Sequence, residues 1–417
     1  MSEPRRQPLK DVDEGADPER DPGGAGSSAR LGAYLRQLRE GYGYTLRKVE
    51  EQSLVLGEPI DNSQLSRFEK GKAVPSFEKL RALARIFNVS VQNFSDILDL
   101  EEYEAFRPSS ENYDELLRTG AAHFSRGEHG RAFVTFERAV EVAEARDGGE
   151  PLGERAVEAR WRMAAALKAL GKLSMTEQEL RRILKERRRL GTRTCMRTLL
   201  QLSYVHREFG DLYLAAVMAR ECLELAVREG ESDIQAGVLN TLGNIHHDEG
   251  EFEKACDCYR QAQQILSTLG SRDELRATVL TNLGGCLVAL DRFEEGIALI
   301  REAHTTAVER GYRRVAALAL TRLGEAQLQH GDRAPARESL AGSDALASRP
   351  EEAYHDILFL NSFRRWEMAR DEGNDTREKI AFGRLRHLRS LIERRFPEVE
   401  EFDRYVEFVR RKHVHAS

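Results

Sequence analysis

Residues 62–71, NSQLSRFEKG, bring side chains that can form hydrogen bonds together in one short segment. Amides and guanidinium groups can each form two hydrogen bonds to one base edge, Asn62 to adenine and Arg67 to guanine. The alternative is a polar helix face that contacts only water. This segment therefore offers binding chemistry, and the elements around it must decide between the two interpretations.

Groups that catalyse reactions or hold metals form no recognisable pattern in the sequence. His246 and His247 are adjacent, so they face different ways on a helix, and no HExxH motif occurs. Neither a GxSxG elbow nor a Walker motif is present. The five cysteines are odd in number and lack CxxC spacing, and Cys256 and Cys258 would lie roughly 200° apart around a helix. We expect buried structural cysteines, with a redox or metal role as the alternative, and we predict no enzyme, no cofactor and no metal site.

Residues 30–100 are predicted to form the unit that positions the polar segment. Apolar residues at helical spacing over 31–38 predict a first helix, which Gly41 ends. Thr45 is suited to be the N-cap of a second helix, and the polar segment forms the third. Two more helices are expected to follow from Ser76.

The order of these parts resembles the Cro/repressor-type (XRE) helix-turn-helix domain. The matching stretches are LRQLREGYGYTLRKVEE and NSQLSRFEKGKAVPSFEKLRALARIFNV. The resemblance implies that the third helix lies in the major groove of DNA, and that Arg39 and Glu69 form a buried ion pair between the first and third helices. Leu65 and Phe68 are expected to anchor the third helix to the core. The turn SLVLGEP is longer than is usual in the family, which leaves the angle between the second and third helices open.

The resemblance also assigns the DNA contacts. Polar residues of the third helix are expected to reach bases, whereas Thr45 and the lysines after that helix suit phosphates. Residues 30–100 contain 11 Lys/Arg against nine Asp/Glu, so one copy would bind weakly and we expect a dimer that reads two half-sites. The expected DNA-binding residues are Thr45, Asn62, Ser63, Gln64, Ser66, Arg67, Lys70 and Lys72.

A second pattern begins at about residue 113. The clearest copies are LNTLGNIHHDEGEFEKACDCYRQA and LTNLGGCLVALDRFEEGIALIREA, and their turn position recurs every 39–44 residues. Small residues flank most turns on both sides, which lets two helix backbones approach closely, as stacked helical hairpins require. The turn positions are Gly127, Gly171, Gly210, Gly250, Asp291, Gly331 and Gly373.

This pattern resembles the tetratricopeptide repeat over residues 113–392, in about seven hairpins. In that family the first helix of each hairpin lines a concave groove. Asn240 and Asn244 are four residues apart and share a helix face, where amides suit the backbone of an extended peptide. The alternative is that these groups are only solvated. The resemblance places in the groove Arg197, Tyr204, Arg207, Asn240, Asn244, His247, Asp248, Thr281, Glu325 and Arg364.

The remaining segments are expected to be tails and connections. Residues 1–29 are rich in Pro, Gly and charged residues, which predicts disorder. Residues 101–112 are predicted to be a linker, and residues 393–417 a C-terminal capping helix. The densely basic segment 181–197 is interpreted as a solvated helix face, with an anionic partner as the alternative.

Composition fits this organisation. The chain has 417 residues, 41% of them hydrophobic and 32% charged, with a net charge of −6. A chain of that length is too long to form a single hydrophobic core of ordinary size. The proportions of hydrophobic and charged residues suit long amphipathic helices. No apolar run approaches the roughly 18 residues of a membrane span, and the N-terminus has no apolar signal, so we expect a cytoplasmic protein without membrane contact.

We therefore predict an all-α protein, with an N-terminal five-helix Cro-type helix-turn-helix domain followed by a right-handed tetratricopeptide-repeat superhelix. This combination resembles the peptide-sensing regulators of the Rgg and PlcR kind, in which a short peptide in the repeat groove shifts DNA binding by a dimer. The resemblance implies double-stranded DNA, a peptide or protein ligand and a second copy of the chain as partners. The alternative is a repeat-based scaffold whose helix-turn-helix module contacts proteins instead of DNA.

Overall fold

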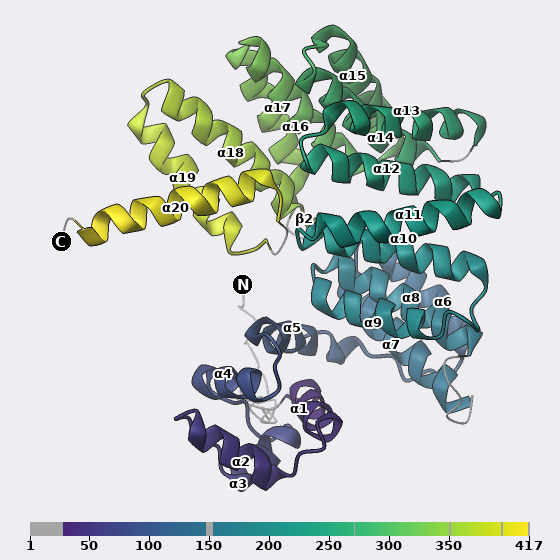
Figure 1. Cartoon of the computed structure of the whole chain (residues 1–417), viewed down its shortest axis with the longest axis vertical. Coiled ribbons are helices and arrows are strands. Elements are labelled where there is room, and N and C mark those ends of the chain that lie inside the picture. Colours follow the sequence, from purple (N-terminus) through teal and green to yellow (C-terminus); the bar gives the residue numbers. More distant parts are fainter. Residues whose placement is uncertain (1–27, 147–152, 271, 350–351, 393–394, 416–417) are drawn as a thin grey trace, which may run out of the picture. The chain divides into compact units, whose positions relative to one another are not determined.

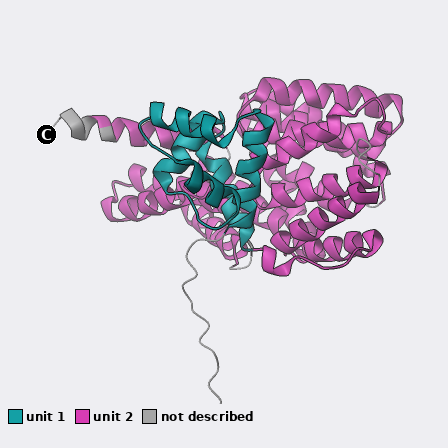
Figure 2. Cartoon of the chain, turned by 90° about the horizontal axis from the view of Figure 1, so that it is seen from below, with its two compact units in different colours: residues 1–102 teal, residues 103–417 magenta. Residues whose placement is uncertain are grey.

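The computed structural model describes residues 28–146, 153–270, 272–349, 352–392 and 395–415. It consists of two compact units, residues 1–102 and 103–417 (Figure 2). The segment expected to be disordered, residues 1–29, lies outside the described residues as far as residue 27. Ser28 and Ala29 already belong to the start of the first helix.

The described part of the first unit contains five α-helices (Figure 1). Each begins after a residue whose side-chain oxygen accepts a hydrogen bond from the backbone N–H three positions further on. The predicted N-caps Thr45 and Ser76 are confirmed. The helices are α1 (Ala29–Gly41), α2 (Leu46–Val55), α3 (Asn62–Glu69), α4 (Phe77–Ile86) and α5 (Val91–Glu101).

Helix α3 is fixed to α1 by close packing and by charge. A Cβ atom on Gly32 would lie 2.6 Å from the carbonyl oxygen of Phe68, so the two helices can approach this closely only because position 32 is glycine. Leu65 and Phe68 are buried, as predicted. The guanidinium of Arg39 binds the Glu69 carboxylate with both Nε and Nη2, at 2.6 and 3.0 Å, which confirms the expected ion pair.

The long turn between α2 and α3 is partly helical. Helix α2 continues to Val55, so the first residues of SLVLGEP extend the helix. Ile60 is fully buried, and its N–H donates to the hydroxyl of Ser53 at 2.9 Å. The loop is therefore anchored at its far end, while Leu54 and Val55 are left 59% and 88% exposed.

The second unit is a row of helical hairpins, each stacked on the next. Seven hairpins are present in its described part. They are α6 (Tyr113–Ser125) with α7 (His129–Arg146), α8 (Glu154–Ala169) with α9 (Leu173–Lys185), α10 (Thr192–Glu208) with α11 (Leu212–Arg228), α12 (Ser232–Asp248) with α13 (Phe252–Thr268), α14 (Asp273–Ala289) with α15 (Phe293–Arg310), α16 (Arg313–His330) with α17 (Arg333–Ala347), and α18 (His355–Asp371) with α19 (Asp375–Arg389).

The hairpin turns and small residues lie where the sequence predicts them. All seven predicted turn positions have positive φ angles, from 62° at Asp291 to 95° at Gly331, a conformation that glycine adopts without strain. A Cβ atom on Gly243 would lie 2.5 Å from the ring of Tyr259 on the paired helix. The small residues therefore set the distance between the helices of a hairpin.

The connections add three short elements. A 3₁₀ helix, η1 (Glu104–Phe106), lies in the predicted linker, where Arg107 forms an ion pair with Glu137 of α7 at 2.6 Å. Strands β1 (Ser348–Arg349) and β2 (Glu352–Ala353) pair antiparallel between α17 and α18. Helix α20 (Pro397–His415) packs on the last hairpin through Val399 and Phe402. Among the described residues, no helix is both long and apolar enough to cross a membrane.

Candidate functional site

Helix α3 presents its polar side chains on one surface. Asn62, Ser63 and Arg67 are exposed, whereas Leu65 and Phe68 on the opposite face are buried. No carboxylate of the described residues forms an ion pair with the Arg67 guanidinium, which leaves it able to bind a ligand. This is the arrangement that base recognition from the start of a helix requires.

Of the other predicted DNA-binding residues, some are exposed and some are partly buried. Lys70 and Lys72 are exposed just after the end of α3, and Thr45 is exposed at the start of α2. Ser66 is half-buried. Gln64 is also half-buried, and its Oε1 accepts a hydrogen bond from Lys79 of α4 at 2.8 Å. Gln64 would have to release Lys79 before it could read a base.

The predicted DNA contacts leave out three further residues of α2 and of the start of α3. Asp61 is the N-cap of α3, since its carboxylate accepts the N–H of Gln64 at 2.7 Å. Arg47 and Lys48, in the first turn of α2, are 82% and 52% exposed. Their position just after the N-cap Thr45 could have pointed to phosphate contacts from the sequence, because helix starts commonly face phosphates.

The first helices of hairpins three to seven line a cavity of about 1300 Å³ in the second unit. Its lining recurs at intervals of three or four residues along each helix, as in Thr278, Asn282 and Gly285 of α14. The cavity exceeds the roughly 300–1,000 Å³ of small-molecule pockets, so it has room for a peptide segment. The predicted groove residues on its wall are Tyr204, Arg207, Asn240, Asn244, His247, Asp248, Glu325 and Arg364.

Two of the predicted groove residues lie elsewhere. Thr281 is fully buried, and its hydroxyl donates to the carbonyl of Ala277 at 2.9 Å. The next residue, Asn282, faces the cavity instead, because one residue turns a helix face by about 100°. Arg197 is not on the cavity wall: its guanidinium lies 3.7 Å above the ring of Trp161 and binds Glu158. Both predictions were therefore wrong about position.

Three asparagines form a ladder on the cavity wall. The Nδ2 of Asn282 donates to the Oδ1 atoms of Asn240 and Asn244, both at 3.1 Å. The hydroxyl of the buried Tyr259 also donates to Asn244 Oδ1, at 2.7 Å. Among the described residues, the Nδ2 groups of Asn240 and Asn244 have no acceptor. They are therefore available to peptide carbonyl oxygens.

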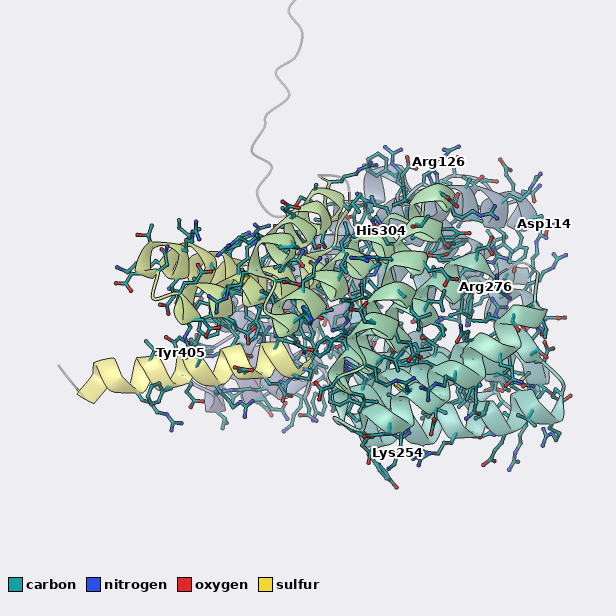
Figure 3. All side chains as sticks on the ribbon, turned by 90° about the horizontal axis from the view of Figure 1, so that it is seen from above. Asp114, Arg126, Lys254, Arg276, His304 and Tyr405 are labelled. Carbon is teal, nitrogen blue, oxygen red and sulfur yellow. The ribbon has the colours of Figure 1, made fainter. Side chains whose placement is uncertain are left out.

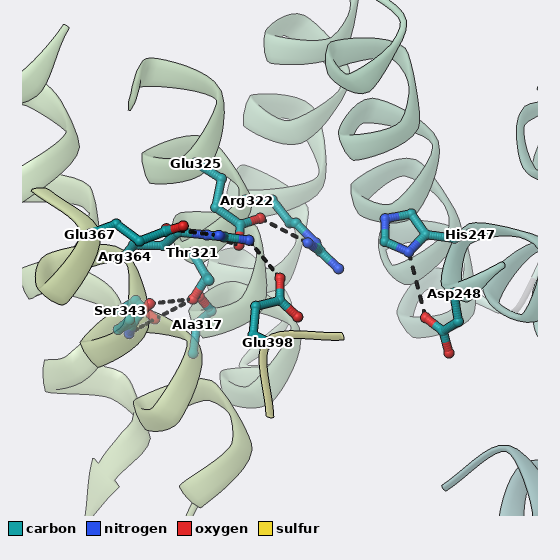
Figure 4. Close-up of polar contacts among 11 residues, drawn as sticks. His247, Asp248, Ala317, Thr321, Arg322, Glu325, Ser343, Arg364, Glu367 and Glu398 are labelled. Carbon is teal, nitrogen blue, oxygen red and sulfur yellow. Dashed lines mark hydrogen bonds and ion pairs between the residues drawn. The ribbon is translucent and has the colours of Figure 1, made fainter. Parts of the chain in front are cut away.

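Side chains of alternating charge from α16, α18 and α20 line the same cavity (Figure 4). Glu325 accepts from Arg322 at 2.8 Å and from Arg364 at 3.0 Å. Burial alone would raise the pKa of Glu325, but the two guanidinium groups outweigh burial and lower this pKa to about 2. Arg364 also binds Glu367 at 2.9 Å and Glu398, which comes from α20, at 2.5 Å.

A second charged pair lies at the other end of the cavity. Arg207 Nε and Asp248 Oδ2 are 2.7 Å apart, and His247 lies 3.5 Å from the same carboxylate. Burial opposes ionisation of Asp248, but Arg207 and His247 lower its pKa to about 2. Both ends of the cavity therefore hold fixed charges with the asparagine ladder between them.

The cysteines and histidines fit structural roles. All five cysteines are free thiols, and only Cys258 is partly exposed, as expected for small residues of packed helices. His246, Glu249 and Glu251 place ligand atoms within 4.8 Å of one another at the turn of the fourth hairpin. His246 Nδ1 lies 3.2 and 2.9 Å from the two carboxylates, within hydrogen-bonding distance, so contacts among these side chains account for the cluster.

Protein-family models match part of each unit. A model described as a helix-turn-helix domain matches residues 30–94, and one described as a tetratricopeptide repeat matches residues 234–304. No curated protein sequence matches the chain. The chain therefore contains a helix-turn-helix domain followed by tetratricopeptide repeats.

Solved structures support the fold. The Rap conjugation gene regulator of plasmid pLS20, in complex with a Phr peptide, has a TM-score of 0.53 at 15% identity and covers 87% of this chain and 95% of its own. A Rap protein complexed with Competence and Sporulation Factor has a TM-score of 0.51 at 13% identity, over 86% and 98%. PlcR of Bacillus thuringiensis, in complex with the peptide PapR7 and DNA, covers 81% and 98% at 16% identity, with a TM-score of 0.29 that is too low to support a shared overall fold.

Proposed function

We propose that the protein is a sequence-specific DNA-binding transcription regulator whose repeat groove binds a peptide or protein ligand. The observation that carries the proposal is the surface of α3, where Asn62, Ser63 and Arg67 are exposed while Leu65 and Phe68 hold the helix in place. Phosphate contacts from Lys70 and Lys72 would add affinity without sequence preference.

The groove supports the ligand part of the proposal. The two Nδ2 groups of Asn240 and Asn244 can donate to an extended backbone, and the arginines at both ends of the cavity can hold carboxylates. Rap proteins with this fold were solved as complexes with a Phr peptide and with Competence and Sporulation Factor. A peptide is thus the ligand class that fits the wall best.

Regulation requires that the ligand bind one state of the protein better than another. In an array whose hairpins contact mainly their neighbours, small shifts at each interface add up to a change in curvature. If the array also holds two copies together, this change moves the two recognition helices relative to each other. Half-sites about 34–36 Å apart make DNA binding sensitive to such a shift.

We expect Asn240→Ala with Asn244→Ala to keep basal DNA binding and to lose the response to ligand, because the variant removes two donors from the groove. The measurement is DNA affinity with and without candidate peptides or cell extract. Asn244→Ala also leaves the Tyr259 hydroxyl without its acceptor, so a stability loss of about 1–3 kcal/mol is expected.

Asn240→Ala alone keeps that acceptor and should weaken the response without this loss. Gln264→Ala, which removes an exposed amide from the second helix of the same hairpin, is the matched control. A double variant that responds as the parent does would place the ligand outside the asparagine ladder.

A scaffold function is the second candidate, and one observation favours it. Leu54 and Val55 are exposed side by side at the end of α2, and Phe77 at the start of α4 is 63% exposed. Apolar groups of this size on a small unit suit a protein contact. Under this alternative the protein would bind a partner protein through the first unit, and changes at Arg67 would have no effect on any DNA interaction.

A further inference from the structure

The start of the C-terminal helix lies inside the groove. Phe396, Pro397, Glu398 and Glu401 line the same cavity as the asparagine ladder. We call residues 395–401 the C-terminal strap. It is part of this chain, yet it occupies the place that the proposed function gives to a ligand.

The strap is held at both ends of the cavity. Next to the third hairpin, the N–H of Arg395 donates to the backbone carbonyl of Glu208 at 2.9 Å. At the seventh hairpin, the ring of Phe396 lies 5.8 Å from that of Phe359. Beyond the strap, Phe402 is buried in the core of the last hairpin.

Helix α20 has further anchors that do not enter the groove. Tyr405, labelled in Figure 3 on the C-terminal helix, lies 4.8 Å from Trp366 between ring centroids. Phe402 lies 5.5 Å from Phe382 of α19 by the same measure. Changes confined to Phe396 and Glu398 would therefore leave α20 attached to the last hairpin.

Within the described residues, the strap forms a side-chain hydrogen bond to the cavity wall through the carboxylate of Glu398. Glu398 Oε1 accepts a hydrogen bond from Arg364 Nη2 at 2.5 Å, and the two side chains are 17% and 22% exposed (Figure 4). Charge-assisted bonds in such surroundings are stronger than neutral ones. Arg364 remains paired with Glu325 and Glu367 when Glu398 leaves, so the groove can exchange one carboxylate for another at little cost.

We propose that the C-terminal strap is an internal ligand of the groove, and that the effector is an extended acidic peptide whose carboxylate replaces Glu398 on Arg364. This inference rests on the proposed ligand-binding role of the groove and names its ligand class. A free peptide competes with a tethered segment, whose effective concentration is in the millimolar range for a short connection. The effector must therefore add contacts that the strap lacks, and the Nδ2 groups of Asn240 and Asn244 provide them.

The test uses the full-length chain and a fluorescent peptide, RFPEVEEF, which contains the strap and Phe402. Binding is followed by fluorescence anisotropy without DNA. The strap variant carries Phe396→Ala and Glu398→Gln. We expect the peptide to bind this variant at least about tenfold more tightly than the parent, because the internal competitor is weakened. A peptide with Gln in place of the first Glu should bind the strap variant about tenfold more weakly than RFPEVEEF.

A second measurement needs no variant. Saturating RFPEVEEF should speed hydrogen exchange in a proteolytic fragment that covers Arg395 and Phe396 of the parent, because the bond from Arg395 to Glu208 opens. Equal peptide affinity for parent and strap variant, binding to neither, or unchanged exchange would overturn the proposal. Because no DNA is present, these outcomes are independent of whether α3 reads a base sequence.

Discussion

Glu69→Ala is expected to lower the free energy of unfolding of the first unit by about 3 kcal/mol. Removing one member of a buried ion pair costs roughly 3–5 kcal/mol, because the other charge is left uncompensated. The side chains of Arg39 and Glu69 are 15% and 8% exposed. We expect the lower end of the range because Glu40, 3.4 Å from Arg39 Nη2, still offers partial compensation.

The measurement is hydrogen exchange of α1 and α3 amides in the full-length chain as a function of denaturant, which reports the unfolding of this unit alone. Glu40→Ala is the matched control. Glu40 is 54% exposed and pairs with the 65% exposed Arg36, and solvent screens such a surface pair, so its loss should change stability little. Equal effects of the two substitutions would show that the Arg39–Glu69 pair does not hold α3 in place.

Arg67→Ala is expected to reduce affinity for the preferred DNA sequence by about 1–3 kcal/mol, roughly 5- to 150-fold. The guanidinium of Arg67 is exposed on α3 and can bind a base with two hydrogen bonds. Sequence preference should relax at one base pair, while binding to unrelated DNA changes little.

Lys72→Ala is the comparison. Lys72 follows α3 and suits a phosphate, so its loss should weaken binding to all sequences alike and lower the salt dependence by about one unit of slope. Competition titrations at several salt concentrations separate the two effects. If Arg67→Ala weakens all sequences equally, its side chain contacts the backbone and not a base.

Periodic features of the sequence predicted most of the fold. The turn positions from Gly127 to Gly373 were identified by a repeated spacing, and each has the positive φ that ends a helix there. Gly243 could be interpreted correctly because a small residue recurs seven positions before the turn. The copies of a pattern that repeats within one chain can be aligned with one another, so a position that is misassigned in one copy can be corrected from the others.

The groove was less predictable because its lining depends on how each helix is rotated about its axis and on segments that are distant in the sequence. Thr281 and Asn282 differ by one helix step, and only the packing of α14 decides which of them faces the cavity. Glu398 lies 34 residues after Arg364, outside the repeat pattern, so no spacing links the two. The sequence assigned its segment to a cap, and only the folded array brings it into the groove.

The most direct test of the central claim is selection of genomic DNA fragments by the full-length protein at about 150 mM salt, where non-specific binding is weakened. We expect a small set of fragments to be enriched, each containing two similar half-sites about 10 base pairs apart centre to centre, or a multiple of that spacing. Arg67→Ala should weaken the enrichment and relax the selected sequence at one base pair of each half-site. Uniform recovery of all fragments, recovery of none, or enrichment that Arg67→Ala leaves unchanged would contradict the assignment of α3 as a DNA-reading helix.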